Sequence, residues 1–178
     1  MKLFAFPHVV LNELMTNMEP VELISLSFCS KNAYALVKLC SMIKDELKVQ
    51  SFTHREYGYS LCFPKRKLSA CAMTRSASIL DTTNLGNSHG IKYCFDDSGS
   101  LYTFWSDYVV GGRETTKYIC DLFKIPVSSI VVYRDEDLWM IDLAQQRQEE
   151  PLREVHAVAR EMSADGYTRI LRYVGSLG

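Results

Sequence analysis

Histidine and cysteine are the side chains of this sequence that could carry nucleophilic or metal chemistry. No two cysteines have the close paired spacing of a zinc site. A cysteine at position 94 or 120 could pair with His156 as an activated thiol, but almost any chain of this composition permits such a pair. We therefore expect reduced, buried thiols, as in cytosolic or nuclear proteins. The residues are His8, His54, His89, His156, Cys29, Cys40, Cys62, Cys71, Cys94 and Cys120.

The run Asp135-Glu136-Asp137 is the one acidic cluster that could hold a divalent cation. A solvated acidic turn that enters a helix N-terminus explains it more simply, since the helix dipole favours negative charge there. The sequence has no P-loop and no His-Glu-x-x-His motif, and Gly111-Gly112 is expected to form the turn before a helix. These observations predict a chain with no catalytic residues, no metal and no cofactor.

Composition sets the class of protein. The 178 residues are 47% hydrophobic and 23% charged, which is typical of a globular protein. The net charge is −1, from 20 basic and 21 acidic residues, so there is no global electrostatic case for nucleic acid or a membrane surface. No apolar run approaches the length of a membrane span. Pro7, His8, Asn12 and Glu13 interrupt the N-terminal apolar segment, which argues against a secretory signal.

The segment from Phe6 to Ile43 has the spacing of three short helices. Apolar residues recur at helical intervals over Val10–Met18, and Pro20 ends that helix and begins the next. A third run, Leu36, Cys40, Ile43 and Leu47, is spaced three and four residues apart.

Three short helices cannot bury this much apolar surface among themselves. Each Leu or Met left exposed forgoes roughly 1.5–3 kcal/mol of burial free energy. The apolar stripe therefore predicts a partner, which is either another domain of this chain or another protein.

This segment resembles an F-box, the module by which substrate receptors dock on the Skp-type adaptor of cullin–RING ubiquitin ligases. The family pattern falls on Phe6-Pro7, Val10–Met18, Glu22-Leu23 and Leu26–Lys31, and its wording is similar to the large nematode families. Phe6 replaces the usual Leu, and the common aromatic residue after the basic one is absent. The resemblance implies that the adaptor is bound by Phe6, Pro7, Val10, Leu11, Leu14, Met15, Met18, Pro20, Glu22, Leu23 and Leu26.

In the remainder of the chain, the spacing of apolar residues is first that of β-strands and then that of alternating helices and strands. Alternating residues predict strands at Tyr59–Phe63 and Leu68–Thr74, with Asp81–Gly90 as a loop. Ile91–Phe95 and Leu101–Trp105 form a predicted hairpin around a Gly-containing loop. We place the boundary between the two modules in the polar segment Lys44–Tyr57.

After Gly111-Gly112 the pattern changes to alternating helices and strands. The predicted elements are a helix ending before Pro126, a strand at Ser129–Tyr133, a helix at Leu138–Glu149, a strand at Leu152–Val158 and a helix at Ser163–Val174. Ile130 and Val155 lie at matching points of the two strands, which is compatible with a leucine-rich-repeat-like solenoid.

The phrase Leu122–Ile130 resembles the type-2 F-box-associated domain, whose members usually continue for many more residues. We therefore expect an α+β protein with an F-box helical module over 1–48 and an F-box-associated module over 58–178. The resemblance implies a non-catalytic substrate receptor of a Skp–cullin–F-box ubiquitin ligase in the ubiquitin conjugation pathway, located in the cytoplasm or nucleus. The alternative is a self-contained protein-interaction domain, with its apolar stripe packed on its own β-rich half and no ligase role.

Overall fold

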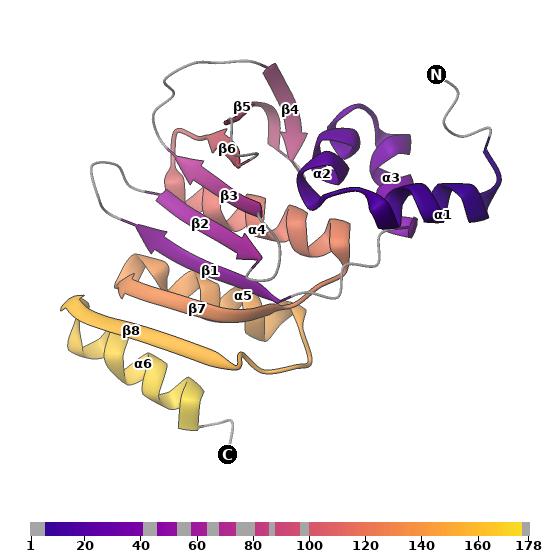
Figure 1. Ribbon diagram of the computed structural model, residues 1–178. Coiled ribbons are helices and arrows are strands. Elements are labelled where there is room, and N and C mark those ends of the chain that lie inside the picture. The colour runs from indigo at the N-terminus through magenta and orange to yellow at the C-terminus, as the bar shows by residue number, and fades with distance from the viewer. Residues whose placement is uncertain are drawn as a thin grey trace.

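The computed structural model describes residues 6–40, 46–52, 58–63, 68–73, 81–85, 88–96 and 100–175, and within these ranges it leaves the side chains of 68–73, 159 and 160 undescribed. The described chain forms an N-terminal group of helices and a mixed β-sheet with further helices on one face (Figure 1). This arrangement confirms the predicted α+β class.

The N-terminal helices are α1 (His8–Asn17), α2 (Pro20–Phe28) and α3 (Lys31–Cys40). Pro20 opens α2 as predicted, and the Glu22 carboxylate accepts a hydrogen bond from the Glu19 N–H at 2.8 Å. The predicted continuation of the third helical run is wrong at Leu47, because this residue begins a strand. Ile43, which belongs to the same run, lies outside the described residues.

One eight-stranded sheet has the order β4-β5-β6-β3-β2-β1-β7-β8. Neighbouring strands are antiparallel except at β3–β6, β1–β7 and β7–β8, which are parallel. The strands are β1 (Leu47–Phe52), β2 (Gly58–Phe63), β3 (Leu68–Met73), β4 (Asp81–Leu85), β5 (Ser88–Phe95), β6 (Leu101–Phe104), β7 (Val127–Arg134) and β8 (Glu154–Glu161).

The predicted hairpin of β5 and β6 is confirmed by the opposition of Phe95 to Leu101. Two predictions about this part of the chain are wrong. The predicted loop Asp81–Gly90 contains β4 and the start of β5, and the segment assigned to the boundary contains β1. Because β1 lies between β2 and β7, it belongs to the centre of the sheet. The domain limits themselves stay a prediction.

Helices α4 (Tyr108–Phe123), α5 (Trp139–Arg147) and α6 (Ala164–Gly175) cover one face of the sheet (Figure 1). The core lies between them and the inward side chains of the strands. Tyr59 packs edge-on against Trp139 of α5, and Phe63 packs edge-on against Phe123 of α4. Val49 of β1 and Ile130 of β7, which are both fully buried, lie opposite each other on this face.

The last elements follow the predicted alternation of strand and helix. In the parallel pair β7–β8, Ile130 lies directly opposite Val155, as their equivalent positions in sequence predicted. Arg169 of α6 forms an ion pair with Asp142 of α5, which joins the two successive helices. The assignment of these units to a leucine-rich-repeat type of solenoid stays a prediction.

The prediction that Gly111 and Gly112 form a turn before a helix is wrong. Both residues lie inside α4 and are buried. The helix begins earlier, at Tyr108, and the carboxylate of its N-cap residue Asp107 accepts hydrogen bonds from the N–H groups of Val109 and Val110 at 2.8 and 3.1 Å. A Cβ on Gly112 would lie 2.2 Å from the ring of Tyr59. The glycines therefore allow α4 to approach β2 closely, a tertiary requirement that local sequence does not reveal.

Replacing Gly112 by Ala should destabilise the protein by about 1–3 kcal/mol. Alanine favours a helix by about 1 kcal/mol relative to glycine, but the overlap with the Tyr59 ring requires α4 or β2 to move, and overpacking outweighs that gain. Gly175→Ala is the control, because a Cβ there meets no atom within 4 Å. Urea unfolding of both variants measures the difference, and equal midpoints would contradict the close approach of α4 to β2.

Candidate partner-binding site

The residues predicted to bind the adaptor divide into three groups according to exposure. Exposed residues are Phe6, Pro7, Val10, Leu14 and Glu22, partly buried residues are Met18 and Leu26, and buried residues are Leu11, Met15, Pro20 and Leu23. The spacing correctly indicated an amphipathic α1, but it could not indicate which apolar side chains this chain covers itself. The binding role of all eleven residues stays a prediction.

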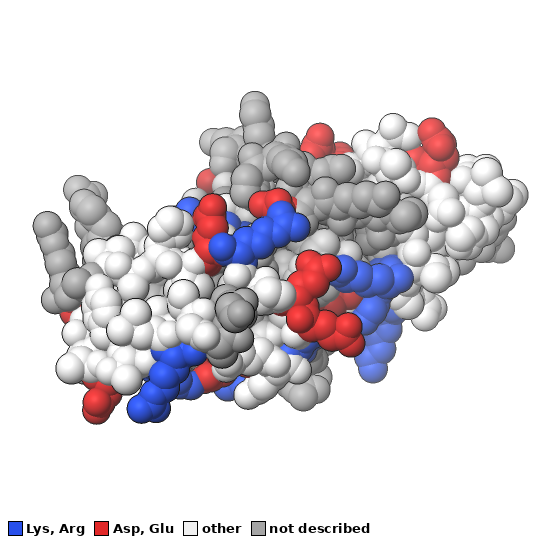
Figure 2. Space-filling model, turned by 90° about the horizontal axis from the view of Figure 1, so that it is seen from below, with Lys and Arg blue, Asp and Glu red and all other residues white. Residues whose placement is uncertain are grey.

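The outer side of α1 carries an apolar stripe. Val10 and Leu14 of α1 are spaced by four residues and are 41% and 44% exposed, so they lie on one side of the helix, and Phe6, two residues before the helix begins, is 45% exposed. Val9, which was not among the predicted residues, is 78% exposed beside them. The end of the molecule formed by α1, at the right in Figure 2, carries few charged side chains. Exposed apolar side chains gathered on one side of a helix are typical of a protein-binding surface.

The inner sides of the three helices belong to the core of the chain. Leu11 and Met15 of α1 are 6% and 2% exposed, and Leu23 and Ile24 of α2 are 1% and 0% exposed. Buried residues of all three helices belong to the same core cluster as those of the sheet. The chain itself therefore covers the apolar residues on the inner side of the helices. The apolar residues on the outer side of α1 remain exposed, and these still call for a partner.

An aromatic and hydroxyl contact joins the N-terminal helices to α4. The Ser27 and Tyr118 hydroxyls are hydrogen-bonded at 2.7 Å, with both side chains buried. Phe28 and Tyr34 pack on the Tyr118 ring with centroid distances of 5.7 and 5.4 Å. Burial raises the pKa of Tyr118 well above its ordinary value, so its hydroxyl stays neutral. This contact sets the position of α2 and α3 on the sheet module.

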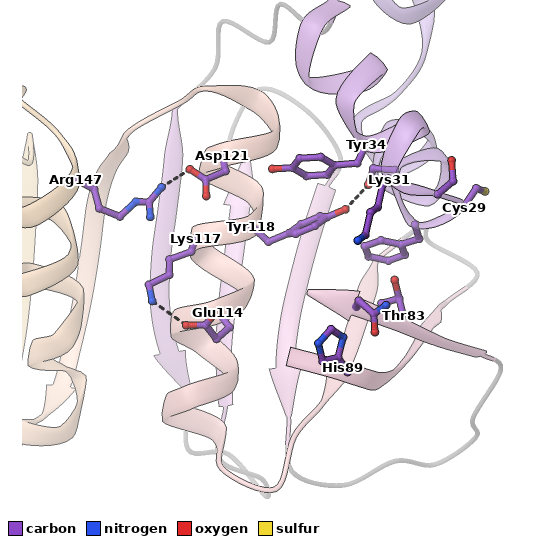
Figure 3. A pocket seen from close by; sticks show the side chains of 14 residues that line it. Cys29, Lys31, Tyr34, Thr83, His89, Glu114, Lys117, Tyr118, Asp121 and Arg147 are labelled. Carbon is purple, nitrogen blue, oxygen red and sulfur yellow. Dashed lines mark hydrogen bonds and ion pairs between the residues drawn. The ribbon is translucent and has the colours of Figure 1, made fainter. Parts of the chain in front are cut away.

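A cleft of about 1190 Å³ opens beside that contact (Figure 3). Its walls come from the end of α2 and the start of α3, from α4, from the β4–β5 hairpin and from Arg147 at the end of α5. Lys117 pairs with Glu114 at 2.8 Å, and Arg147 pairs with Asp121. The cleft therefore combines charged, hydroxyl and aromatic side chains from parts of the chain that are distant in sequence, and sequence reasoning did not find it.

The structure does not assemble the thiol–imidazole pair. His156 lies on β8, where its imidazole contacts the Glu154 carboxylate at 3.3 Å, whereas Cys94 lies on β5 near the opposite edge of the sheet. No hydrogen bond joins Cys120 to His156 in the described part of the chain. Every cysteine whose side chain is described is a free thiol. The predicted burial is confirmed for Cys40 and is wrong for Cys29, which is exposed, whereas Cys62, Cys94 and Cys120 are partly buried.

Cys29 should react with iodoacetamide far faster than Cys120. Burial raises the pKa of Cys120 to about 12, which leaves about one thiolate in ten thousand at pH 8, whereas Cys29 is exposed. Peptide mass spectrometry after timed labelling at pH 8 measures both rates. Labelling of Cys120 at the rate of Cys29 would contradict the burial of this thiol, and Cys29→Ser provides the control for site assignment.

The acidic run 135–137 forms a 3₁₀ turn directly before α5, and Asp135 and Glu136 are exposed, as expected for the predicted solvated turn, whereas Asp137 is buried. Asp137 is fully buried and accepts hydrogen bonds from the Ser51 and Tyr59 hydroxyls at 2.5 and 2.9 Å. The Asp135 carboxylate accepts a hydrogen bond from the Ser163 N–H at the start of α6. No group of three or more potential ligands that could hold a metal ion occurs among the described residues.

The segment Gly86–Gly90 has the Gly-x-Ser-x-Gly spacing of many hydrolases, although it was not among the candidates above. In those enzymes the serine lies on a sharp turn from a strand to a helix. Ser88 instead begins β5, opposite Leu85 of β4. The surroundings that would make this serine a nucleophile are therefore missing from the described hairpin.

None of the helices described here is long and apolar enough to cross a membrane.

Comparison with known proteins gives one finding about the N-terminal helices. No curated protein and no solved structure matches the chain. The family model described as the F-box domain matches residues 3–44, a segment that contains α1, α2 and α3. The surface with the exposed apolar stripe thus belongs to an F-box domain.

Proposed function

We propose that this chain is a substrate-recognition subunit of a Skp–cullin–F-box ubiquitin ligase. F-box domains bind the Skp-type adaptor within cullin–RING ligases, and the match to residues 3–44 identifies such a domain here. The observation that supports docking is the outer side of α1, where Val10 and Leu14 remain exposed, together with Phe6 just before the helix, although the inner side is buried in the chain's own core. The adaptor covers this stripe.

The rest of the chain acts as the receptor module in this proposal. It presents a protein substrate so that its lysines reach the ubiquitin carried by the ligase, which raises effective concentration without a catalytic group of its own. F-box proteins are generally non-catalytic adaptors, and the match to residues 3–44 supports that role here. The relation of this module to the type-2 F-box-associated domain of nematode proteins, and a cytoplasmic or nuclear location, are parts of the same proposal.

A second candidate function is a self-contained interaction domain without a ligase role. The specific observation in its favour is the contact of Ser27, Phe28 and Tyr34 with Tyr118, because it fastens the helices to the sheet module of the same chain. The two candidates differ at the outer side of α1, which stays open to solvent in a self-contained protein.

Co-expression with a Skp-type adaptor tests the proposal. We expect a stable complex on size-exclusion chromatography and loss of exposed apolar surface on complex formation. The chain expressed alone should bind a hydrophobic dye such as ANS, and the adaptor should suppress that signal. A monodisperse chain that neither binds the dye nor captures the adaptor would favour the self-contained domain.

A further inference from the structure

The cleft beside Tyr118 has the features of a substrate site in a chain with the function proposed above. It lies at the junction of the F-box helices with the sheet module, where α2, α3, α4 and the β4–β5 hairpin all contribute side chains (Figure 3). Its volume of about 1190 Å³ exceeds the roughly 300–1,000 Å³ of an ordinary small-molecule site. The size and open shape suit a segment of polypeptide.

The charged residues of the cleft differ in whether they already have partners. Glu114 and Asp121 are each engaged by a cation of the chain, Lys117 and Arg147 respectively. Lys31, at the start of α3, is exposed and has no ion pair or hydrogen bond within the described chain, and its ammonium group extends into the cleft in Figure 3. The start of α3 adds the positive end of a helix dipole. The ammonium group of Lys31 is therefore the charge in the cleft that a ligand would complement, and the ligand group would be negative.

A second observation also points to a ligand with hydrogen-bond acceptors. Thr83 of β4 is only 8% exposed, it lines the cleft, and its hydroxyl has no hydrogen-bond partner in the described part of the chain. The hydroxyl is open to the cleft and not enclosed in the core, so it can donate a hydrogen bond to an acceptor bound there. The exposed imidazole of His89 on β5 lies on the same wall (Figure 3).

The remaining wall is apolar. Phe28 and Tyr34 present their rings beside the charged residues, with the buried Tyr118 ring packed against them, and the Phe28–Tyr93 contact at 4.9 Å supports the ring wall from β5. Thr83 and Asn84 belong to β4, which is an edge strand of the sheet. An extended peptide can form main-chain hydrogen bonds with an edge strand and can place its side chains against a row of sites beside that strand.

We propose that this cleft binds an acidic, extended peptide segment, with a carboxylate at Lys31 and Thr83 and apolar side chains on Phe28 and Tyr34. This inference rests on the proposed ligase function only for its biological role, since the peptide site itself requires no adaptor. The substrate class is therefore a protein with an exposed acidic segment that also contains aromatic or aliphatic residues.

Three fluorescein-labelled peptide pools test the inference. Each peptide has ten residues. Two central positions are both Glu in the first pool, both Gln in the second and both Lys in the third, and the other eight positions are randomised among apolar and small residues. We expect the Glu pool to bind the full-length chain about tenfold more tightly than the Gln pool in fluorescence polarisation, which corresponds to one favourable charge contact. The Lys pool should bind most weakly.

Lys31→Glu should abolish the preference for Glu and transfer it to the Lys pool, because the local charge is reversed. Arg113→Glu is the matched control, since it changes the net charge by the same amount at an exposed position of α4 that does not line the cleft. Thr83→Val should weaken binding of the Glu pool about threefold, as expected for one hydrogen bond, without reversing the preference. Equal binding of the three pools, or equal effects of Lys31→Glu and Arg113→Glu, would overturn the inference.

Capture of the Skp-type adaptor is measured on the same preparations. Adaptor capture without any pool preference would leave the ligase proposal in place and reject the peptide site. Pool preference without adaptor capture would support the peptide site and reject the ligase role. The two failures are therefore distinguishable.

Discussion

Leu14→Asp should reduce adaptor capture by about a hundredfold. Leu14 is 44% exposed and lies one turn after Val10 on the outer side of α1, so an Asp there would bury an unpaired charge when the adaptor covers the stripe. A loss of about 3 kcal/mol is typical of a central interface residue and corresponds to a factor of about a hundred in affinity. The measurement is titration of the purified chain with the Skp-type adaptor by isothermal calorimetry.

A matched control separates this effect from a general effect of charge. Leu171 of α6 is 64% exposed on a different helix, and Leu171→Asp should leave adaptor affinity within about twofold. Leu23→Asp is unsuitable, because Leu23 is 1% exposed and the substitution would unfold the chain. Adaptor affinity unchanged in Leu14→Asp, with a folded protein by circular dichroism, would exclude docking through the outer side of α1.

Asp137→Ala should lower the free energy of unfolding by about 3–5 kcal/mol, the cost of breaking a buried ion pair from one side. The Asp137 carboxylate accepts hydrogen bonds from the Ser51 and Tyr59 hydroxyls, from the N–H groups of Tyr133 and Arg134, and from the Arg134 guanidinium at 3.4 Å. Alanine would leave these donors and the charge of Arg134, which is 8% exposed, without their acceptor.

This cluster also explains why the loss should spread through the sheet. Ser51 lies on β1, Tyr59 on β2 and Arg134 at the end of β7, so one carboxylate joins three adjacent strands. The proximity of the Asp137 carboxylate adds to burial in raising the pKa of Tyr59 far above its ordinary value. Tyr59 is therefore held as a neutral donor to Asp137.

Urea unfolding followed by tryptophan fluorescence measures the effect, since Trp139 packs on Tyr59. The matched control is Asp142→Ala, which removes a partly exposed pair with Arg169 and should cost less than about 1 kcal/mol. A loss in Asp137→Ala no larger than that of Asp142→Ala would show that the buried network contributes little to stability.

Several elements could be predicted because their signals are local. The apolar periodicity and Pro20 define α1 and α2, and alternation around the Asp96–Ser100 loop defines the β5–β6 hairpin. The equivalence of Ile130 and Val155 was readable because each belongs to a short apolar strand followed by a helix. The strand β1 also has an alternating pattern, but Lys48 and Gln50 make the segment as polar as a linker.

The sequence by itself determined that the N-terminal segment is an amphipathic F-box domain, and that strands precede alternating strands and helices. Only the tertiary structure decided that Leu23 is buried and Leu14 exposed, that Gly112 admits the Tyr59 ring, and that Asp137 lies in the core. Burial of a side chain depends on which distant residue reaches it: Ser51 and Tyr59 lie 86 and 78 positions from Asp137. Helical or strand periodicity specifies the sides of one element, but packing between elements specifies which side a partner can reach.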